Sequence, residues 1–121
     1  SQKLFTATTL ELNIRSLRDI LFILQRLAYL RKLNKIDDDM IDFFKSYFST
    51  GATLLNLLQM LHQDNSNQEI FPHVLWWIEK NNFKSKSHTS LPPKLQEIYN
   101  EALSGKRLFF LNGKWELMKS N

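Results

Sequence analysis

Hydrophobic residues recur three or four positions apart along most of the chain, which is the spacing of one buried helix face. The run from Leu17 to Ala28 predicts a helix that begins at about residue 9 or 16 and ends near residue 33. Met40 to Phe48 repeats the spacing behind three aspartates, whose charge favours a helix N-terminus. Gly51 is expected to end this second helix.

Three further helices are expected in the second half. Leucines between residues 54 and 61 predict a third helix, and the polar segment 62–68 reads as a loop. Pro72 suits the first turn of a fourth helix, which ends near residues 81–82. Ser90 is expected to cap a fifth helix that has two prolines in its first turn.

The C-terminal segment has a different pattern. Gly105 is expected to end the fifth helix, and Asn112-Gly113 then separates two apolar runs. This dipeptide is a strong hairpin signal, because both turn positions need a positive φ. An isolated hairpin is only marginally stable, so Phe109, Phe110 or Trp115 must pack on the helices. The predicted fold is all-α, with about five helices and a short C-terminal β-hairpin.

The predicted helix starts align at a constant offset of 37 residues. Ser16, Thr53 and Ser90 occupy corresponding positions. Three apolar columns share the offset: Leu17, Leu54 and Leu91; Leu21, Leu58 and Leu95; Leu24, Leu61 and Ile98. A period of this size is typical of α-solenoids, which stack antiparallel helical pairs. The alternative is a helical bundle whose helices happen to be evenly spaced.

The length of 121 residues has room for one domain, 1–121. The repeat divides it into a helical pair at 8–51, a second pair at 52–83, and a terminal helix with its hairpin cap at 90–121. No apolar run approaches the roughly 20 residues that span a bilayer. Because small secreted domains often carry disulfides and this chain has no cysteine, an intracellular or organellar location is expected.

The pattern Ser-Leu-x-x-Ile-Leu-x-x-Leu-x-x-Leu from Ser16 to Leu27 precedes a phenylalanine-rich second helix. It resembles organellar helical-repeat families, namely the octotricopeptide and heptatricopeptide repeats and the helical region of FAST-domain proteins. The resemblance covers residues 13–100 and implies a role in an RNA-containing complex in a mitochondrion or another organelle. Those families have many more units, which suggests either a capped fragment or a subunit docked on something larger.

Composition argues against an enzyme. The chain has no cysteine, which excludes disulfides, thiolate nucleophiles and cysteine-ligated zinc. Its three histidines are scattered, and its three glycines suit turns rather than a phosphate-binding loop. The aspartates at 37–39 and 42 resemble a cation site only superficially, because a helix N-terminus explains them. We expect no catalytic residue, metal, cofactor or small-molecule substrate.

One stripe of the first helix combines cations with aromatic rings. At 100° per residue, five side chains fall within about 80°: Arg15, Arg18, Phe22, Arg26 and Tyr29. Guanidinium groups suit phosphates, and the rings between them suit stacking on RNA bases. The alternatives are that the two rings belong to the core, with arginine stems over its edge, or that a partner helix covers the stripe.

A second basic region follows the fourth helix. We expect its cations to contact RNA or an acidic partner: Lys84, Lys86, Lys106, Arg107 and Lys114. The alternative is that these lysines are simply solvated. The net charge of +4 permits either interpretation.

Trp76 and Trp77 are adjacent, and neighbouring residues of a helix point about 100° apart. One indole is expected to face another helix, while Trp76 is the candidate partner contact. The alternative is that both are core residues.

These features favour a non-catalytic helical-repeat module that docks into a larger assembly, with an RNA-containing complex first. The runner-up is a protein–protein adaptor or accessory subunit of a complex without RNA. A winged-helix-like DNA binder is a third class, against which the long leucine-rich first helix argues.

Overall fold

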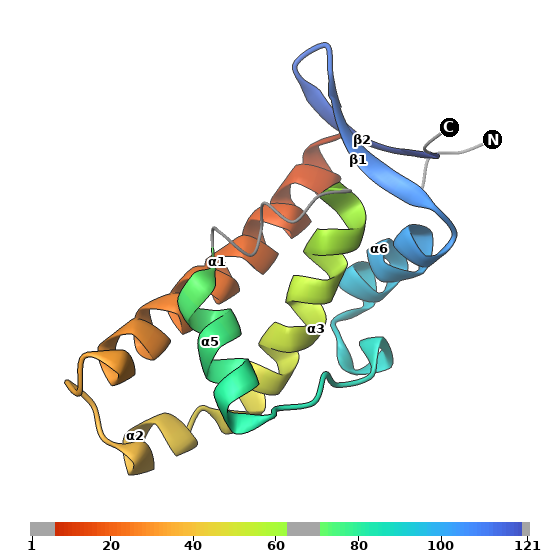
Figure 1. The fold of residues 1–121 in the computed structure, drawn as a ribbon. Helices are drawn as coiled ribbons and strands as arrows, with labels where there is room; N and C mark the ends of the chain where they lie inside the picture. Colours follow the sequence, from red (N-terminus) through yellow and green to blue (C-terminus); the bar gives the residue numbers. More distant parts are fainter. Residues whose placement is uncertain (1–6, 63–70, 120–121) are drawn as a thin grey trace.

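The computed structural model describes residues 7–62 and 71–119. These residues form five α-helices, a short 3-10 turn and an antiparallel hairpin (Figure 1). The elements are α1 (Ala7–Lys32), α2 (Asp38–Asp42), α3 (Lys45–His62), α5 (Pro72–Asn81), η1 (His88–Ser90), α6 (Pro93–Leu103), β1 (Lys106–Leu111) and β2 (Lys114–Lys119). The predicted fold class is confirmed. None of the helices described is long and apolar enough to cross a membrane.

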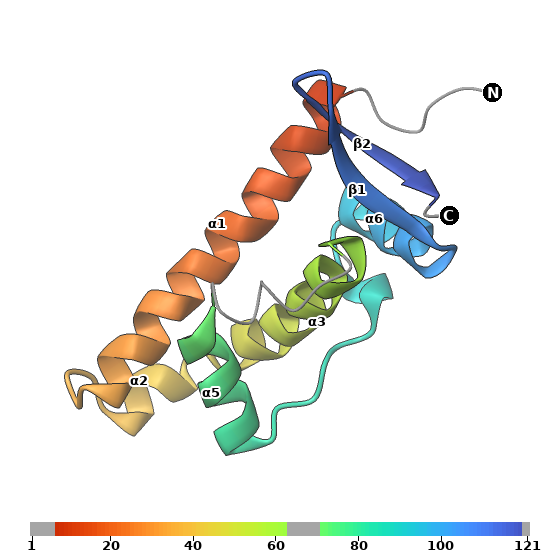
Figure 2. The same cartoon turned by 45° about the horizontal axis from the view of Figure 1, so that its top comes forward.

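The central element is α3, which contacts α1, α5, α6 and β1. Its side chains are buried on almost every side, as expected for a helix surrounded by others. In Figures 1 and 2, α1, α3 and α5 run alternately up and down, and α6 lies on the far side of α3 from α1. The buried residues of α3 are Phe48, Gly51, Ala52, Thr53, Leu54, Leu55, Leu57, Leu58 and Leu61.

The longest helix, α1, buries a single stripe. Its buried residues alternate between steps of four and three: Leu10, Ile14, Leu17, Leu21, Leu24 and Ala28. The remaining faces of α1 are therefore available for the groove and the exposed side chains described below.

The prediction that Gly51 ends a helix is wrong. Gly51 lies inside α3, and a Cβ atom there would stand only 2.7 Å from Cδ1 of Leu24. The glycine therefore allows α1 and α3 to approach closely and does not mark a turn. The helix starts assigned to Ser16 and Thr53 are wrong as well, since both residues lie inside helices. The border between the predicted pairs, at residues 51 and 52, falls within α3.

The apolar columns nevertheless mark the core. All nine of their residues, from Leu17 to Ile98, are buried. The constant offset thus relates core positions, although none of the three aligned residues begins an α-helix. Ser90 is not the cap of the last helix either: it lies in η1, and Pro92 stands at the N-cap of α6.

Several helix ends follow the local signals in the sequence. Asp37 caps α2, with Oδ1 accepting a hydrogen bond from the backbone N–H of Met40 at 2.8 Å. Pro72 begins α5, and Asn82 ends it in the left-handed conformation with φ 53°. Pro93 begins α6.

The hairpin also forms where it is predicted. Asn112 and Gly113 have φ angles of 52° and 75°, which the turn requires. Leu108 pairs with Leu117 and Phe110 with Trp115, so these side chains share one face of the two-stranded sheet. β1 contacts α3 and α6, whereas β2 contacts α1. Trp115 packs against the core, as one of the three predicted side chains was expected to do, whereas Phe110 is exposed. Leu108, which was not among them, is buried.

Candidate contact surfaces

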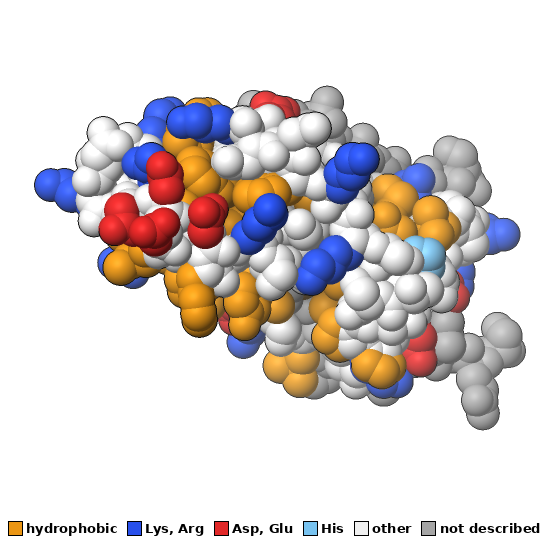
Figure 3. Space-filling view, turned by 90° about the horizontal axis from the view of Figure 1, so that it is seen from below, with side chains coloured by type: hydrophobic (Ala, Val, Ile, Leu, Met, Phe, Trp, Pro, Cys, Tyr) orange, Lys and Arg blue, Asp and Glu red, His pale blue; other side chains and the backbone are white. Residues whose placement is uncertain are grey.

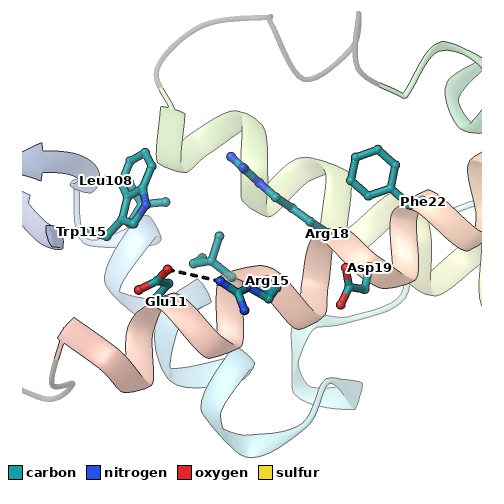
Figure 4. A pocket seen from close by; sticks show the side chains of 8 residues that line it. Glu11, Arg15, Arg18, Asp19, Phe22, Leu108 and Trp115 are labelled. Atoms are coloured by element: carbon teal, nitrogen blue, oxygen red, sulfur yellow. Dashed lines mark hydrogen bonds and ion pairs between the residues drawn. The ribbon is translucent and has the colours of Figure 1, made fainter. Parts of the chain in front are cut away.

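A groove lies between α1 and the hairpin, with a volume of about 260 Å³ (Figure 4). Arg15, Arg18 and Phe22 line it from α1, and Leu108 and Trp115 line it from the two strands. Three of the five residues of the predicted stripe are therefore brought together in one place. Trp115 was expected to pack on the helices. Its position beside Arg15 and Arg18 could not be expected, because only the folded chain brings residues so far apart in sequence together.

The two arginines of the groove are already engaged. Nη2 of Arg15 lies 3.4 Å from Oε1 of Glu11, one turn earlier, and both side chains are exposed. Nη2 of Arg18 lies 3.1 Å from Nε2 of His62, at the end of α3. A guanidinium can only donate, so this ring nitrogen accepts. The His62 ring stands edge-on to Trp115, with centroids 6.1 Å apart, which connects Arg18 to the hairpin.

Acidic side chains also line the groove. Glu11 and Asp19 stand against Arg15 and Arg18, so the charges of the lining residues balance formally. The Glu11–Arg15 pair is solvent-exposed, and exposed pairs of this kind contribute about 0–1 kcal/mol. An anion could therefore replace Glu11 at little cost.

The other two residues of the stripe, Arg26 and Tyr29, lie outside the groove. Arg26 is exposed. The rings of Phe22 and Tyr29 are about half-exposed and touch the start of α5, at Phe71 (centroids 5.0 Å apart) and His73 (4.8 Å). The two aromatic residues thus lie at the edge of the core with one side accessible to solvent. They pack on the core, as one interpretation of the sequence had it, and still expose ring surface to a ligand, as the other had it.

A contact that the sequence did not reveal holds α5 in place. Oε1 of Gln25, on α1, accepts hydrogen bonds from the backbone N–H groups of His73 (3.0 Å) and Val74 (3.1 Å). Phe71, at the N-cap of α5, offers no side-chain acceptor, so Gln25 caps this helix from a neighbouring one. No local sequence motif marks such a cap.

The second basic region is not one patch. Lys84 and Lys86 are exposed on the linker between α5 and η1, residues 83–87. This linker is bound to α3, because Oγ1 of Thr53 donates to the carbonyl oxygen of Lys86 at 2.7 Å. The backbone N–H of Lys86 in turn donates to the carbonyl oxygen of Ser49 at 3.5 Å.

The other cations of this region lie at the far end of the molecule. Lys106 forms an ion pair with Glu101. Nη1 of Arg107 donates to the carbonyl oxygen of Ala102 at 3.0 Å, so this guanidinium caps the end of α6. Lys114 is exposed next to the hairpin turn. The structure therefore divides the five predicted cations among the linker, the α6–β1 junction and the hairpin tip.

The two adjacent tryptophans differ as expected. Trp77 is buried and packs against Phe48, with ring centroids 6.4 Å apart. Trp76 is half-buried, and the ammonium groups of Lys32 and Lys80 lie 5.5 and 5.1 Å from its ring centroid. Cations over an indole face are mutually stabilising. A contact of Trp76 with a partner stays a prediction.

Several large apolar side chains are exposed outside the predicted contact residues. Leu12, Ile20 and Ile23 are exposed on α1. Met40, Phe43 and Tyr47 are exposed where α2 meets α3. Figure 3 shows hydrophobic side chains protruding beside the acidic group and along one edge of the molecule. The helical spacing of residues 40–48 suggested core positions, but only Ile41 and Phe48 of this run are buried.

Comparison of this chain with models of known protein families, with curated proteins and with solved structures found no match. Within residues 7–62 and 71–119, no group of three or more histidine and acidic side chains is placed to hold a metal ion. A function for the chain therefore has to be argued from its own surfaces.

Proposed function

We propose that this chain is a non-catalytic module that docks into an RNA-containing assembly, where single-stranded RNA contacts the groove between α1 and the hairpin. The observation that carries the proposal is the meeting of Arg15, Arg18 and Phe22 with Trp115 around one groove. An organellar location follows only from the family resemblance.

The lining offers the two kinds of contact that single-stranded nucleic acid uses. Guanidinium groups bind phosphate through paired N–H donors. Exposed aromatic rings stack on bases without regard to sequence. Trp115 and Phe22 stand on opposite sides of Arg18 (Figure 4), and Arg26 is a further cation on the same helix, about two turns beyond Arg18. The RNA backbone would follow α1, with a base against the indole.

The test is the binding of a fluorescein-labelled oligouridine, measured by anisotropy across a range of KCl concentrations. The variant Arg15→Glu/Arg18→Glu removes both groove cations. We expect it to weaken binding at least tenfold and to reduce the slope of log Kd against log salt by about 1.4, since each phosphate contact to a single strand contributes about 0.7. Matching melting temperatures would show that the variant is folded.

The matched control is Lys35→Glu/Lys45→Glu. It changes the net charge by the same amount at two exposed lysines outside the groove. A loss of binding equal to that of the arginine variant would mean that RNA responds to total charge, and the groove would not be its site. Absence of any salt-dependent binding by the native chain would also overturn the proposal.

The second candidate is a protein–protein adaptor without RNA. Two observations favour it: Glu11 and Asp19 balance the charge of the groove, and apolar side chains such as Ile23 are exposed. This candidate predicts that one purified partner protein stays bound at high salt, that no RNA is retained, and that the arginine variant keeps the partner.

A further inference from the structure

The junction of α2 and α3 exposes three large apolar side chains. Met40 is 53% exposed, Tyr47 55%, and Phe43 78%, the largest fraction among the exposed large hydrophobic residues of the described chain. They lie three and four residues apart, Met40 in α2, Phe43 in the turn between the helices and Tyr47 in the first turn of α3. The backbone of this junction is held by hydrogen bonds from Phe43 N–H to Asp39 O and from Tyr47 N–H to Phe44 O.

Residues that pack on the core lie next to these exposed side chains. Phe44 is half-buried against the core, and its ring lies 5.3 Å from that of Phe43 and 5.9 Å from that of Tyr47. Ile41, next to Met40, is fully buried. The exposed rings are therefore held by their neighbours, and binding would cost little ordering of this surface.

The segment that carries this surface, residues 37–47, is acidic, with Lys45 as its one basic residue. Residues 37–42 contain four of the 12 acidic residues, although the net charge is +4. Asp38 is paired with Arg31, whose Nε lies 2.8 Å from Oδ1. Asp39 and Asp42 are exposed and have no ion pair among the residues that the structure describes. Figure 3 shows the acidic side chains gathered at this end of the molecule, beside hydrophobic ones.

We propose that the α2–α3 corner, formed by Met40, Phe43 and Tyr47 with Asp39 and Asp42, binds a basic amphipathic helix of a partner protein. An apolar stripe on that helix would cover the three exposed side chains, as in other complexes where a helix is recognised by its apolar face. Lysine or arginine residues flanking the stripe would meet the two unpaired aspartates. The corner lies apart from the groove, so the proposal holds whether or not RNA binds there.

The experiment uses two fluorescein-labelled peptides of about 18 residues with leucines at helical spacing, one with lysines and the other with glutamates at the remaining positions. The full chain is titrated against each peptide at low and high salt. We expect the lysine peptide to bind at least tenfold more tightly than the glutamate peptide. Phe43→Ala should weaken lysine-peptide binding roughly tenfold, the loss typical of a central aromatic contact.

Two further variants separate the charge from the apolar contribution. Asp39→Asn/Asp42→Asn should weaken binding of the lysine peptide at low salt and flatten its salt dependence. Phe110→Ala is the matched control, because Phe110 is a similarly exposed phenylalanine, 60%, on the hairpin. It should leave binding unchanged.

Three outcomes would overturn the proposal. The first is equal binding of the two peptides, and the second is an equal loss in the Phe43→Ala and Phe110→Ala variants. The third is a dimer of the native chain that Phe43→Ala dissociates, since the occupant of the corner would then be a second copy. Loss of RNA binding on Arg15→Glu/Arg18→Glu with lysine-peptide binding intact would keep the two proposals distinct.

Discussion

The hydroxyl of Thr53 is expected to hold the basic linker, residues 83–87, against α3. Thr53 is only 1% exposed, and its Oγ1 donates to the carbonyl oxygen of Lys86 at 2.7 Å. The substitution Thr53→Val keeps the branched shape of the side chain and removes the donor. A methyl group then replaces the hydroxyl and faces the carbonyl oxygen of Lys86, which loses its donor.

The size of the effect follows from what the carbonyl loses. A hydrogen bond contributes about 1 kcal/mol net, and leaving a buried acceptor unsatisfied costs about 1–3 kcal/mol. Lys86 lies on an exposed linker, where water can replace part of the lost contact. We therefore expect a loss of about 1–2 kcal/mol in the free energy of unfolding, and a fall in Tm of roughly 3–8 °C for a domain of this size.

Urea unfolding measures the stability, and limited trypsin digestion at Lys84 and Lys86 reports on the linker itself. The control is Thr50→Val, the same substitution one turn earlier, where Oγ1 donates to Ser46 O within its own helix at 3.2 Å. Its effect should stay within about 0.5 kcal/mol, with an unchanged cleavage rate. If Thr53→Val matched this control in both measurements, the hydroxyl would not hold the linker.

Two further predictions concern contacts of α1. Gly51→Ala should be more favourable, by about 1–3 kcal/mol, in a Leu24→Ala background than in the native chain, because the new methyl group meets Cδ1 of Leu24. A double-mutant cycle by urea unfolding measures this difference, and a coupling near zero would contradict the close approach of α1 and α3. Gln25→Ala should cost about 1 kcal/mol through loss of the α5 cap, whereas Gln25→Glu should retain stability, because a carboxylate accepts the same two N–H groups and suits a helix N-terminus. Equal thermal stabilities of these two variants would refute the capping role.

The features that could be predicted from the sequence are those decided by neighbouring residues. Asp37, Pro72 and Asn112-Gly113 act through their own backbone or the next turn, and each performs the predicted role. The apolar columns also identify the core, because burial follows helical spacing wherever a helix forms.

The features that could not be predicted depend on residues distant in the chain. Gly51 is a residue type that often ends a helix. Here a glycine is needed for another reason, because α1 brings Leu24 against this position and leaves no room for a Cβ atom. The cap of α5 is supplied by Gln25, 48 residues before the first N–H group that it binds. The stripe on α1 could be predicted from helical spacing, whereas the position of Trp115 beside it could not.

The groove between α1 and the hairpin joins the first and last elements of the described chain. β2 packs on α1, and Trp115 lines the same groove as Glu11. Contacts so far apart in sequence form late, because closing a long loop costs entropy before any contact compensates for it. During synthesis, α1 leaves the ribosome before the hairpin against which it packs. A nascent chain cut short before residue 115 would therefore expose part of the buried stripe of α1 and lack one wall of the groove.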